Sequence, residues 1–219
     1  PPVIITQSTT SARYVAAAGG AGNSTTGGTQ ATFNFVSTSG AATITEIAFQ
    51  VSGSDANPTQ TIAQVCVGGV CGSPTTSVSG PNTQLIDLTT LSLAVPNGGG
   101  GLTLSAQVIY SNVGTNGIAP GKTSTLSLAY VKYTTGSSTK TLGTSGACTA
   151  LSVTCDATLS ATVNAPTMTM IGSKPTVTVN GATLTGLTQS GEYKIGEITV
   201  VADAKGNIKL NDVAYSVVS

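Results

Sequence analysis

The fold class is decided by the stretch Leu102-Thr103-Leu104-Ser105-Ala106-Gln107-Val108-Ile109-Tyr110. Apolar side chains occupy every second position, which is the period of a β-strand that turns one face toward a core. Three more segments alternate in the same way, and their expected core positions are Ile47, Phe49 and Val51; Leu126, Leu128, Tyr130 and Lys132; and Leu159, Ala161 and Val163. Turn-forming residues separate these segments, and no long helical pattern occurs. The sequence therefore predicts an all-β fold, an immunoglobulin-like or jelly-roll β-sandwich with a C-terminal β extension.

The composition limits the partners of the chain. Charged residues make up 7% of it, against about a quarter in an average globular domain, so its surface depends on hydroxyl and amide groups. Eight basic residues balance eight acidic ones, which leaves no net charge to attract nucleic acid or an anionic membrane. No apolar run reaches the roughly 18 residues that cross a bilayer. We expect neither nucleic-acid binding nor membrane insertion.

The four cysteines predict two local disulfides. Cys66 and Cys71 flank a Val-Gly-Gly-Val tetrapeptide, whose glycines suit the positive φ angles of a two-residue hairpin turn. The two cysteines then face each other as a non-hydrogen-bonded pair, at a separation that a disulfide spans. Cys148 and Cys155 form the second pair. A four-cysteine zinc site is the alternative, but the spacings are long and histidine is absent. Disulfides in turn predict an extracellular or periplasmic setting, and of these we expect the extracellular cell surface.

A weak internal repeat indicates how the chain is divided. Residues 43–51 align with residues 209–217 and match an acid, an aliphatic residue, Ala, an aromatic residue and Val in order. We therefore expect a main β-sandwich over residues 1–165 and a C-terminal β-hairpin unit, an incomplete repeat, over residues 166–219. A unit of so few strands leaves one sheet face and its edges open, so other strands must complete it. Those strands would come from the same chain, from a following domain or from a neighbouring subunit by strand addition.

The two ends of the chain differ in character. Val3, Ile4 and Ile5 form an isolated apolar strand within the N-terminal segment 1–17. This strand is either the first strand of its own sandwich or a strand donated to a neighbour. At the other end, seven of the 16 charged residues fall in the last 28 positions. Charged pairs on strands protect open sheet edges, and a seam of salt bridges between subunits is the alternative.

The residue types argue against catalysis. Without histidine the chain cannot form a Ser-His-Asp triad, a Cys-His pair or a histidine-ligated metal site. Glycoside hydrolysis needs two acids across a cleft, and the aromatic residues that normally line a sugar subsite are only 4% of the chain. The oxygen-rich loops at residues 55–57 and 203–207 lack the ligand number of a calcium loop. We expect no enzyme activity, metal or cofactor. Asn23 begins the only Asn-X-Ser/Thr triplet in which X is not proline, and it is a candidate for N-glycosylation.

One part of the chain is similar to a known family. Residues 172–179, Gly-Ser-Lys-Pro-Thr-Val-Thr-Val, and residues 196–210 resemble the immunoglobulin-like β-sandwich repeats of large secreted surface proteins from ultrasmall bacteria. In that family the repeats are structural spacers or adhesive modules without catalytic residues. The resemblance therefore implies a structural or adhesive role, and it transfers no site residue to this chain.

These features predict a structural subunit of an extracellular filament or surface layer. It would assemble by β-strand addition between subunits, and its partners would be copies of itself. The alternative is an adhesin or carbohydrate-binding β-sandwich module of a larger cell-surface protein, with glycans as partners. Such a module would present exposed aromatic residues or acidic calcium ligands in loops at one end of the sandwich. The six tyrosines fall mostly within strand patterns instead.

Overall fold

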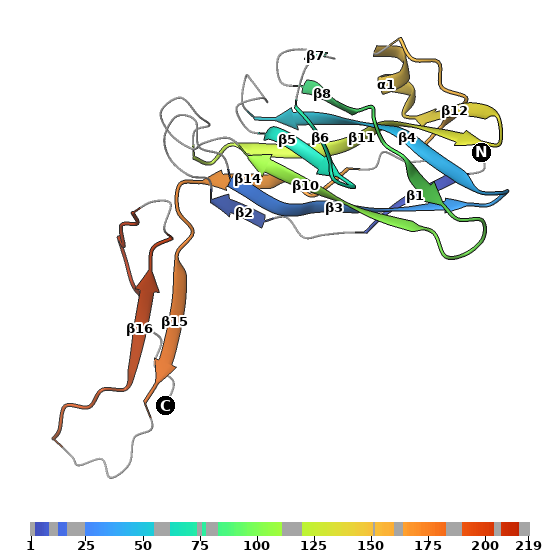
Figure 1. Cartoon of the computed structure of the whole chain (residues 1–219). Coiled ribbons are helices and arrows are strands. Elements are labelled where there is room, and N and C mark those ends of the chain that lie inside the picture. The colour runs from blue at the N-terminus through green and yellow to red at the C-terminus, as the bar shows by residue number, and fades with distance from the viewer. Residues whose placement is uncertain are drawn as a thin grey trace.

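The computed structural model describes residues 3–8, 13–16, 25–54, 62–73, 76–77, 83–110, 120–150, 152–159, 164–182, 190–203 and 207–214. In this part of the chain two β-sheets, of five and nine strands, pack face to face, and a third sheet of two strands lies outside them (Figure 1). The fold is thus the all-β sandwich that the sequence predicts, with a C-terminal β extension.

The five-stranded sheet contains the segment that decides the fold. Its strands, in spatial order, are β1 (Val3–Ser8), β3 (Thr25–Ser37), β10 (Leu102–Tyr110), β5 (Ile62–Val67) and β6 (Val70–Gly72), all antiparallel to their neighbours. β10 is central, and its alternate side chains from Leu104 to Tyr110 are buried while Leu102 packs against the same core. The predicted alternation is confirmed. The strand β1 forms one edge of this sheet.

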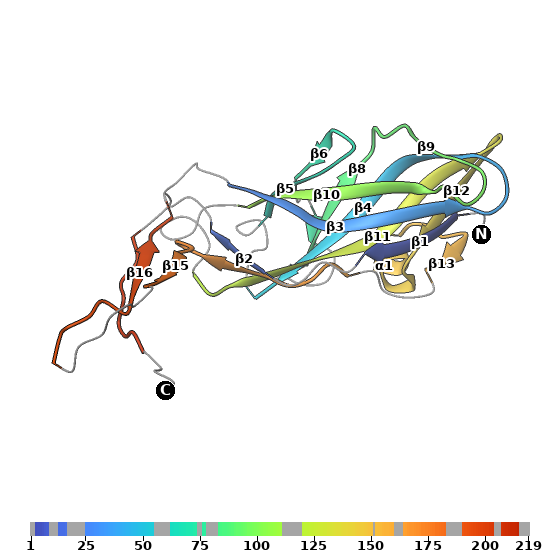
Figure 2. The ribbon, with the colours of Figure 1, turned by 90° about the horizontal axis from the view of Figure 1, so that it is seen from below.

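The nine-stranded sheet covers the other side of the core (Figure 2). Its main path runs β13 (Ala157–Thr158), β12 (Ser138–Gly143), β11 (Thr123–Thr135), β4 (Ala42–Gly53), β8 (Thr83–Leu88) and β7 (Thr76–Ser77). Beside this path lie β9 (Leu93–Val95), β14 (Met168–Ile171) and β2 (Arg13–Ala16). β9 pairs with β4, while β14 pairs antiparallel with β11 and parallel with β2.

The core lies between the two sheets. Phe33 of β3 and Phe49 of β4 meet across it with ring centroids 5.7 Å apart. Ile47 and Val51 point the same way as Phe49, as predicted, and all three are essentially inaccessible to solvent. Each such side chain contributes about 1.5–3 kcal/mol by leaving water. These contacts join residues far apart in the chain and hold the two layers together.

A β-bulge in β11 overturns one expectation from the sequence. The pairing of β11 with β4 shifts register between Leu128 and Tyr130, which leaves Ala129 as the extra residue. An extra residue reverses the alternation of a strand, because successive side chains point to opposite faces. Val131 therefore enters the core, while Tyr130 joins a separate apolar cluster on the outer face. The prediction that Tyr130 and Lys132 share the core face of Leu128 was wrong.

The end of the sandwich lies later in the chain than the repeat suggested. Met168 and Met170 of β14 are completely buried, so the sandwich extends past the expected boundary at residue 165. Residues 43–51 lie in β4, but the described residues aligned with them, 209–214, form no strand. A strand needs a hydrogen-bonding neighbour, and residues 209–214 have none among the described strands. Of the segment 159–163, only Leu159 is described, and it packs against the core just after β13.

Candidate functional site

The most distinctive surface of the described chain is a β-hairpin that protrudes from the sandwich. It consists of β15 (Thr176–Gly181) and β16 (Gly196–Val201), which pair antiparallel over their full length and form a sheet of their own. Figures 1 and 2 show this hairpin extending away from the end of the sandwich that is opposite to the N-terminus. We refer to residues 176–181 and 196–201 as the protruding hairpin.

The protruding hairpin has one apolar and one polar face. Because side chains alternate along a strand, the pairs Val177–Val200 and Val179–Ile198 share one face. On the opposite face Thr178 pairs with Thr199 and Asn180 with Glu197, and Val201, opposite Thr176, is the one large apolar side chain there. In a sandwich, an apolar sheet face of this kind is covered by a second sheet. Here Val177 is 57% exposed and Val179 is 70% exposed, while Ile198 is 36% exposed and Val200 is half-buried, so the β15 half of this face is the part that the described chain leaves uncovered.

Exposed apolar side chains are concentrated in this part of the molecule. Among the side chains that the structure describes, the large hydrophobic residues that remain exposed are Val177, Val179, Tyr193, Ile195, Ile198, Val201, Leu210 and Val213. All of them follow β14, and none belongs to the sandwich. Contiguous apolar surface outside a core marks a contact site for another molecule. The protruding hairpin and residues 190–195 and 207–214 beside it in sequence are therefore the candidate interface.

The strand nearest the N-terminus, β1, is part of the five-stranded sheet of its own sandwich. Val3, Ile4 and Ile5 belong to β1, which pairs along its whole length with β3. Val3 is 1% exposed and Ile5 packs against the core. Of the two roles that the sequence left open, the structure shows the strand within its own chain. Its other edge pairs with no strand in the described residues.

Both predicted disulfides are confirmed. Cys66 and Cys71 pair across the hairpin of β5 and β6 with Cα atoms 4.1 Å apart. Gly68 and Gly69 form the turn with φ angles of +57° and +84°, as the Gly-Gly sequence predicted. In this conformation a side chain would be strained, so glycine fits both positions.

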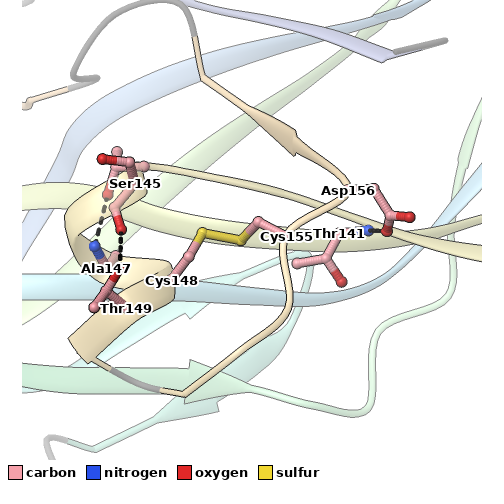
Figure 3. The surroundings of a disulfide bond; sticks show 8 residues. Thr141, Ser145, Ala147, Cys148, Thr149, Cys155 and Asp156 are labelled. Carbon is pink, nitrogen blue, oxygen red and sulfur yellow. Dashed lines mark hydrogen bonds between the residues drawn. A yellow bond between two sulfur atoms is a disulfide. The ribbon is translucent and has the colours of Figure 1, made fainter.

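The second disulfide holds together the connection between β12 and β13, which lies on the outer face of the nine-stranded sheet. We refer to α1 (Ser145–Ala150) and residues 152–156 of this connection as the strap. Cys148 lies in the short helix α1, which the sequence did not predict, and Cys155 lies in the segment that returns to β13 (Figure 3). The backbone N–H of Ala147 is bonded to the Thr144 hydroxyl, which caps the helix. Asp156 fixes the returning segment, because its carboxylate accepts the backbone N–H of Thr141 at 2.8 Å.

A polar cluster lies next to this strap, and sequence reasoning did not find it. The Tyr130 hydroxyl donates to Oε1 of Glu46 at 2.6 Å and lies 3.3 Å from Oδ2 of Asp87. Lys132 Nζ donates to both carboxylate oxygens of Glu46, at 2.8 and 3.0 Å, and stands 5.3 Å from the Tyr130 ring centre. The cluster thus joins three neighbouring strands, β4, β8 and β11. A charged residue within each of these three strands was the available signal in a chain with so few charges.

Burial and neighbouring charges shift the pKa of two groups in the polar cluster, Asp87 and Tyr130. Burial, and then the negative charge of Glu46, raise the pKa of Asp87 above its ordinary value. Burial and the hydrogen bond to Glu46 also raise the pKa of Tyr130, so its hydroxyl keeps its proton. Asp87 Oδ1 is buried and has no hydrogen-bond partner among the residues that the structure describes. The hydrogen bond from Tyr130 and the positive charge of Lys132 oppose the rise in the pKa of Asp87 only in part, so Asp87 takes up a proton more readily on acidification than an ordinary carboxyl group does.

Other residues singled out from the sequence contribute no described site. Asn23 and residues 55–57 lie outside the described residues, as do residues 204–206 of the second oxygen-rich loop. In the part of the chain that is described, no group of three or more acidic or cysteine side chains is placed to hold a metal ion. Tyr110, Tyr130 and Tyr133 are buried in the sandwich. No helix in the described ranges is long and apolar enough to span a bilayer.

The fold and the exposed hairpin define a class, an all-β sandwich protein with an uncovered β-hairpin at one end. Comparison with known proteins adds no family to this description. The chain matches no protein-family model, and no curated protein matches it.

Proposed function

We propose that this protein is a structural subunit of an extracellular filament or surface layer, and that copies of it assemble by β-strand addition. The single observation that carries the proposal is the protruding hairpin, whose apolar face is exposed at Val177 and Val179. An isolated two-stranded hairpin is marginally stable at best in water, and three or more strands are needed for independent stability. Strands from another subunit would supply what the hairpin lacks.

The remaining surface suits a structural role outside the cell. Two disulfides staple local segments of the sandwich, and disulfides persist where the environment is oxidising. With 7% charged residues, the surface offers little electrostatic repulsion between copies. The resemblance of residues 172–179 and 196–210 to repeats of bacterial surface proteins supports the same role.

The test is whether the full chain polymerises through this hairpin. We would produce the chain in an oxidising compartment and follow its mass by light scattering during size-exclusion chromatography at increasing concentration. We expect the mass to rise with concentration, and negative-stain electron microscopy should show filaments or sheets. A chain that stays monomeric at every concentration would refute the proposal. A matched variant, Val177→Asp, should stay monomeric, while Thr199→Asp on the polar face should polymerise.

A further inference from the structure

The strand β1 is an unusual edge for a soluble protein. It spans six residues, whereas the other strands at sandwich edges in the described chain, β2, β6, β7, β9 and β13, have two to four. Soluble proteins protect long sheet edges with charges, prolines or bulges, because a bare edge pairs with other strands. Between Val3 and Ser8 there is no charge and no proline, and the pairing with β3 runs without a bulge.

The protruding hairpin offers a strand of the same length. β15 spans six residues, carries no charge and pairs only with β16 in the described chain. β16 differs, because it contains Glu197, which forms an ion pair with Lys194. A charged side chain on a strand discourages further pairing at that edge. The free edge of β15 is therefore the open side of the hairpin.

The side-chain pattern of the two strands selects one way of pairing them. Antiparallel pairing over all six residues places Ile5 opposite Val179 and Val3 opposite Gly181. These residues belong to the core face of β1 and the apolar face of β15. Parallel pairing over the same length would place Val3 beside Thr176 and thus join the core face to the polar face. A mismatch of this kind is unfavourable, since a shift of one residue moves every side chain to the other face.

The positions of the two strands exclude pairing within one molecule. The protruding hairpin and the N-terminal end of β1 lie at opposite ends of the sandwich in both views (Figures 1 and 2). A contact between two different surfaces at opposite ends repeats from copy to copy and gives an open chain of subunits. Pairing of two identical hairpins would instead close on itself as a dimer.

From these observations we propose that β15 of one subunit adds to the β1 edge of the next, antiparallel, with Val179 opposite Ile5. The inference rests on the proposed function and specifies its donor and its acceptor. The five-stranded sheet of one subunit is thereby extended by the two strands of its neighbour. The N-terminal strand takes part in assembly as the acceptor, while it stays in its own sheet.

Engineered cysteines in the full chain test this pairing. Thr6 and Thr178 are exposed, and the proposed register places them directly opposite each other, at a distance that a disulfide spans. The variant Thr6→Cys/Thr178→Cys should give a ladder of covalent multimers on a non-reducing gel, and reduction should collapse it. Each single variant should give no ladder.

A second pair of variants tests the apolar face. In the double-cysteine background, Val179→Lys should lower the cross-linked fraction about tenfold, because a lysine ammonium buried against Ile5 lacks a partner. Thr176→Lys adds the same charge to the polar face of the same strand and should leave the cross-linked fraction within about twofold. Both positions are exposed, so neither variant disturbs the sandwich.

The outcomes separate this pairing from the broader proposal. Covalent dimers from Thr178→Cys alone would show that two hairpins pair with each other, and this would overturn the inference. Polymers in light scattering without a ladder would overturn it as well, and would leave polymerisation itself standing. Monomers at every concentration would overturn both the inference and the proposed function.

Discussion

Replacing Tyr130 by Phe tests whether the polar cluster stabilises the nine-stranded sheet. The change removes one hydroxyl and keeps the ring, so the contact of Lys132 with the ring is preserved. Glu46 loses the donor at 2.6 Å and keeps its ion pair with Lys132. Asp87 loses a weaker contact at 3.3 Å.

The expected loss follows from this geometry. A hydrogen bond to a charged group contributes about 1.5–3 kcal/mol, and removing the donor also leaves a desolvated acceptor. The Glu46 side chain is only 14% exposed, so water replaces the lost hydroxyl poorly. We expect Tyr130→Phe to lower the free energy of unfolding by about 2 kcal/mol. In a sandwich of this size that corresponds to a fall in Tm of about 4–8 °C.

Urea unfolding at neutral pH, followed by circular dichroism, would measure the effect. The control is Tyr133→Phe, since Tyr133 lies in the same strand, is equally buried and makes no hydrogen bond through its hydroxyl within the described residues. The midpoint should fall in Tyr130→Phe with an unchanged m-value, and it should hardly move in the control. Equal shifts in the two variants would refute the stabilising role of the cluster.

Three further predictions concern stability. Gly143→Ala should lower the free energy of unfolding, measured by thermal unfolding, by about 1–3 kcal/mol, because the added Cβ would lie 2.8 Å from the nearest side-chain atom. The control is Gly146→Ala in α1, where the added Cβ meets nothing within 4 Å; it should leave the stability unchanged or raise it. The pair Cys66→Ser/Cys71→Ser should cost about 2 kcal/mol in urea, since the closed loop is short; a loss large enough to unfold the sandwich would contradict this. The raised pKa of Asp87 means that its contribution to stability is present below the ordinary value of 3.8 and is lost as pH rises through the folded value. Wild type should therefore gain stability relative to Asp87→Asn between pH 7 and pH 4, and parallel pH profiles would disprove the assignment.

The sequence predicted best what local rules determine. The alternation of residues 102–110 identified a strand and its core face, because a period of two residues has few other causes. The Gly-Gly turn and the two cysteines beside it identified a hairpin and its disulfide, because positive φ angles at both turn positions favour glycine. In each case a few neighbouring residues carry the full signal.

What depends on distant partners was not predictable from the sequence. The bulge at Ala129 arises from the pairing of β11 with β4, and no residue type marks it. The polar cluster brings Glu46, Asp87 and Lys132 together from three strands, so it exists only after the strand order is known. The same holds for β1, since the sequence left open whether it belongs to its own sandwich or is donated to a neighbour, and its place beside β3 came from the structure. The hairpin unit was predicted, but its separation from the sandwich required the structure.

The pairing of β2 with β14 has a consequence for the time course of folding. β2 lies near the start of the described chain and β14 ends at Ile171, so the two strands can pair only after all of the chain between them has been made. Contacts between such distant residues form slowly, because the ordering entropy of a long loop precedes any gain. A chain that emerges N-terminus first therefore keeps β2 without its partner strand until Ile171 has been made. The protruding hairpin follows β14 directly, so the proposed donor strand β15 is made only after the strands of the sandwich, which include the proposed acceptor, β1.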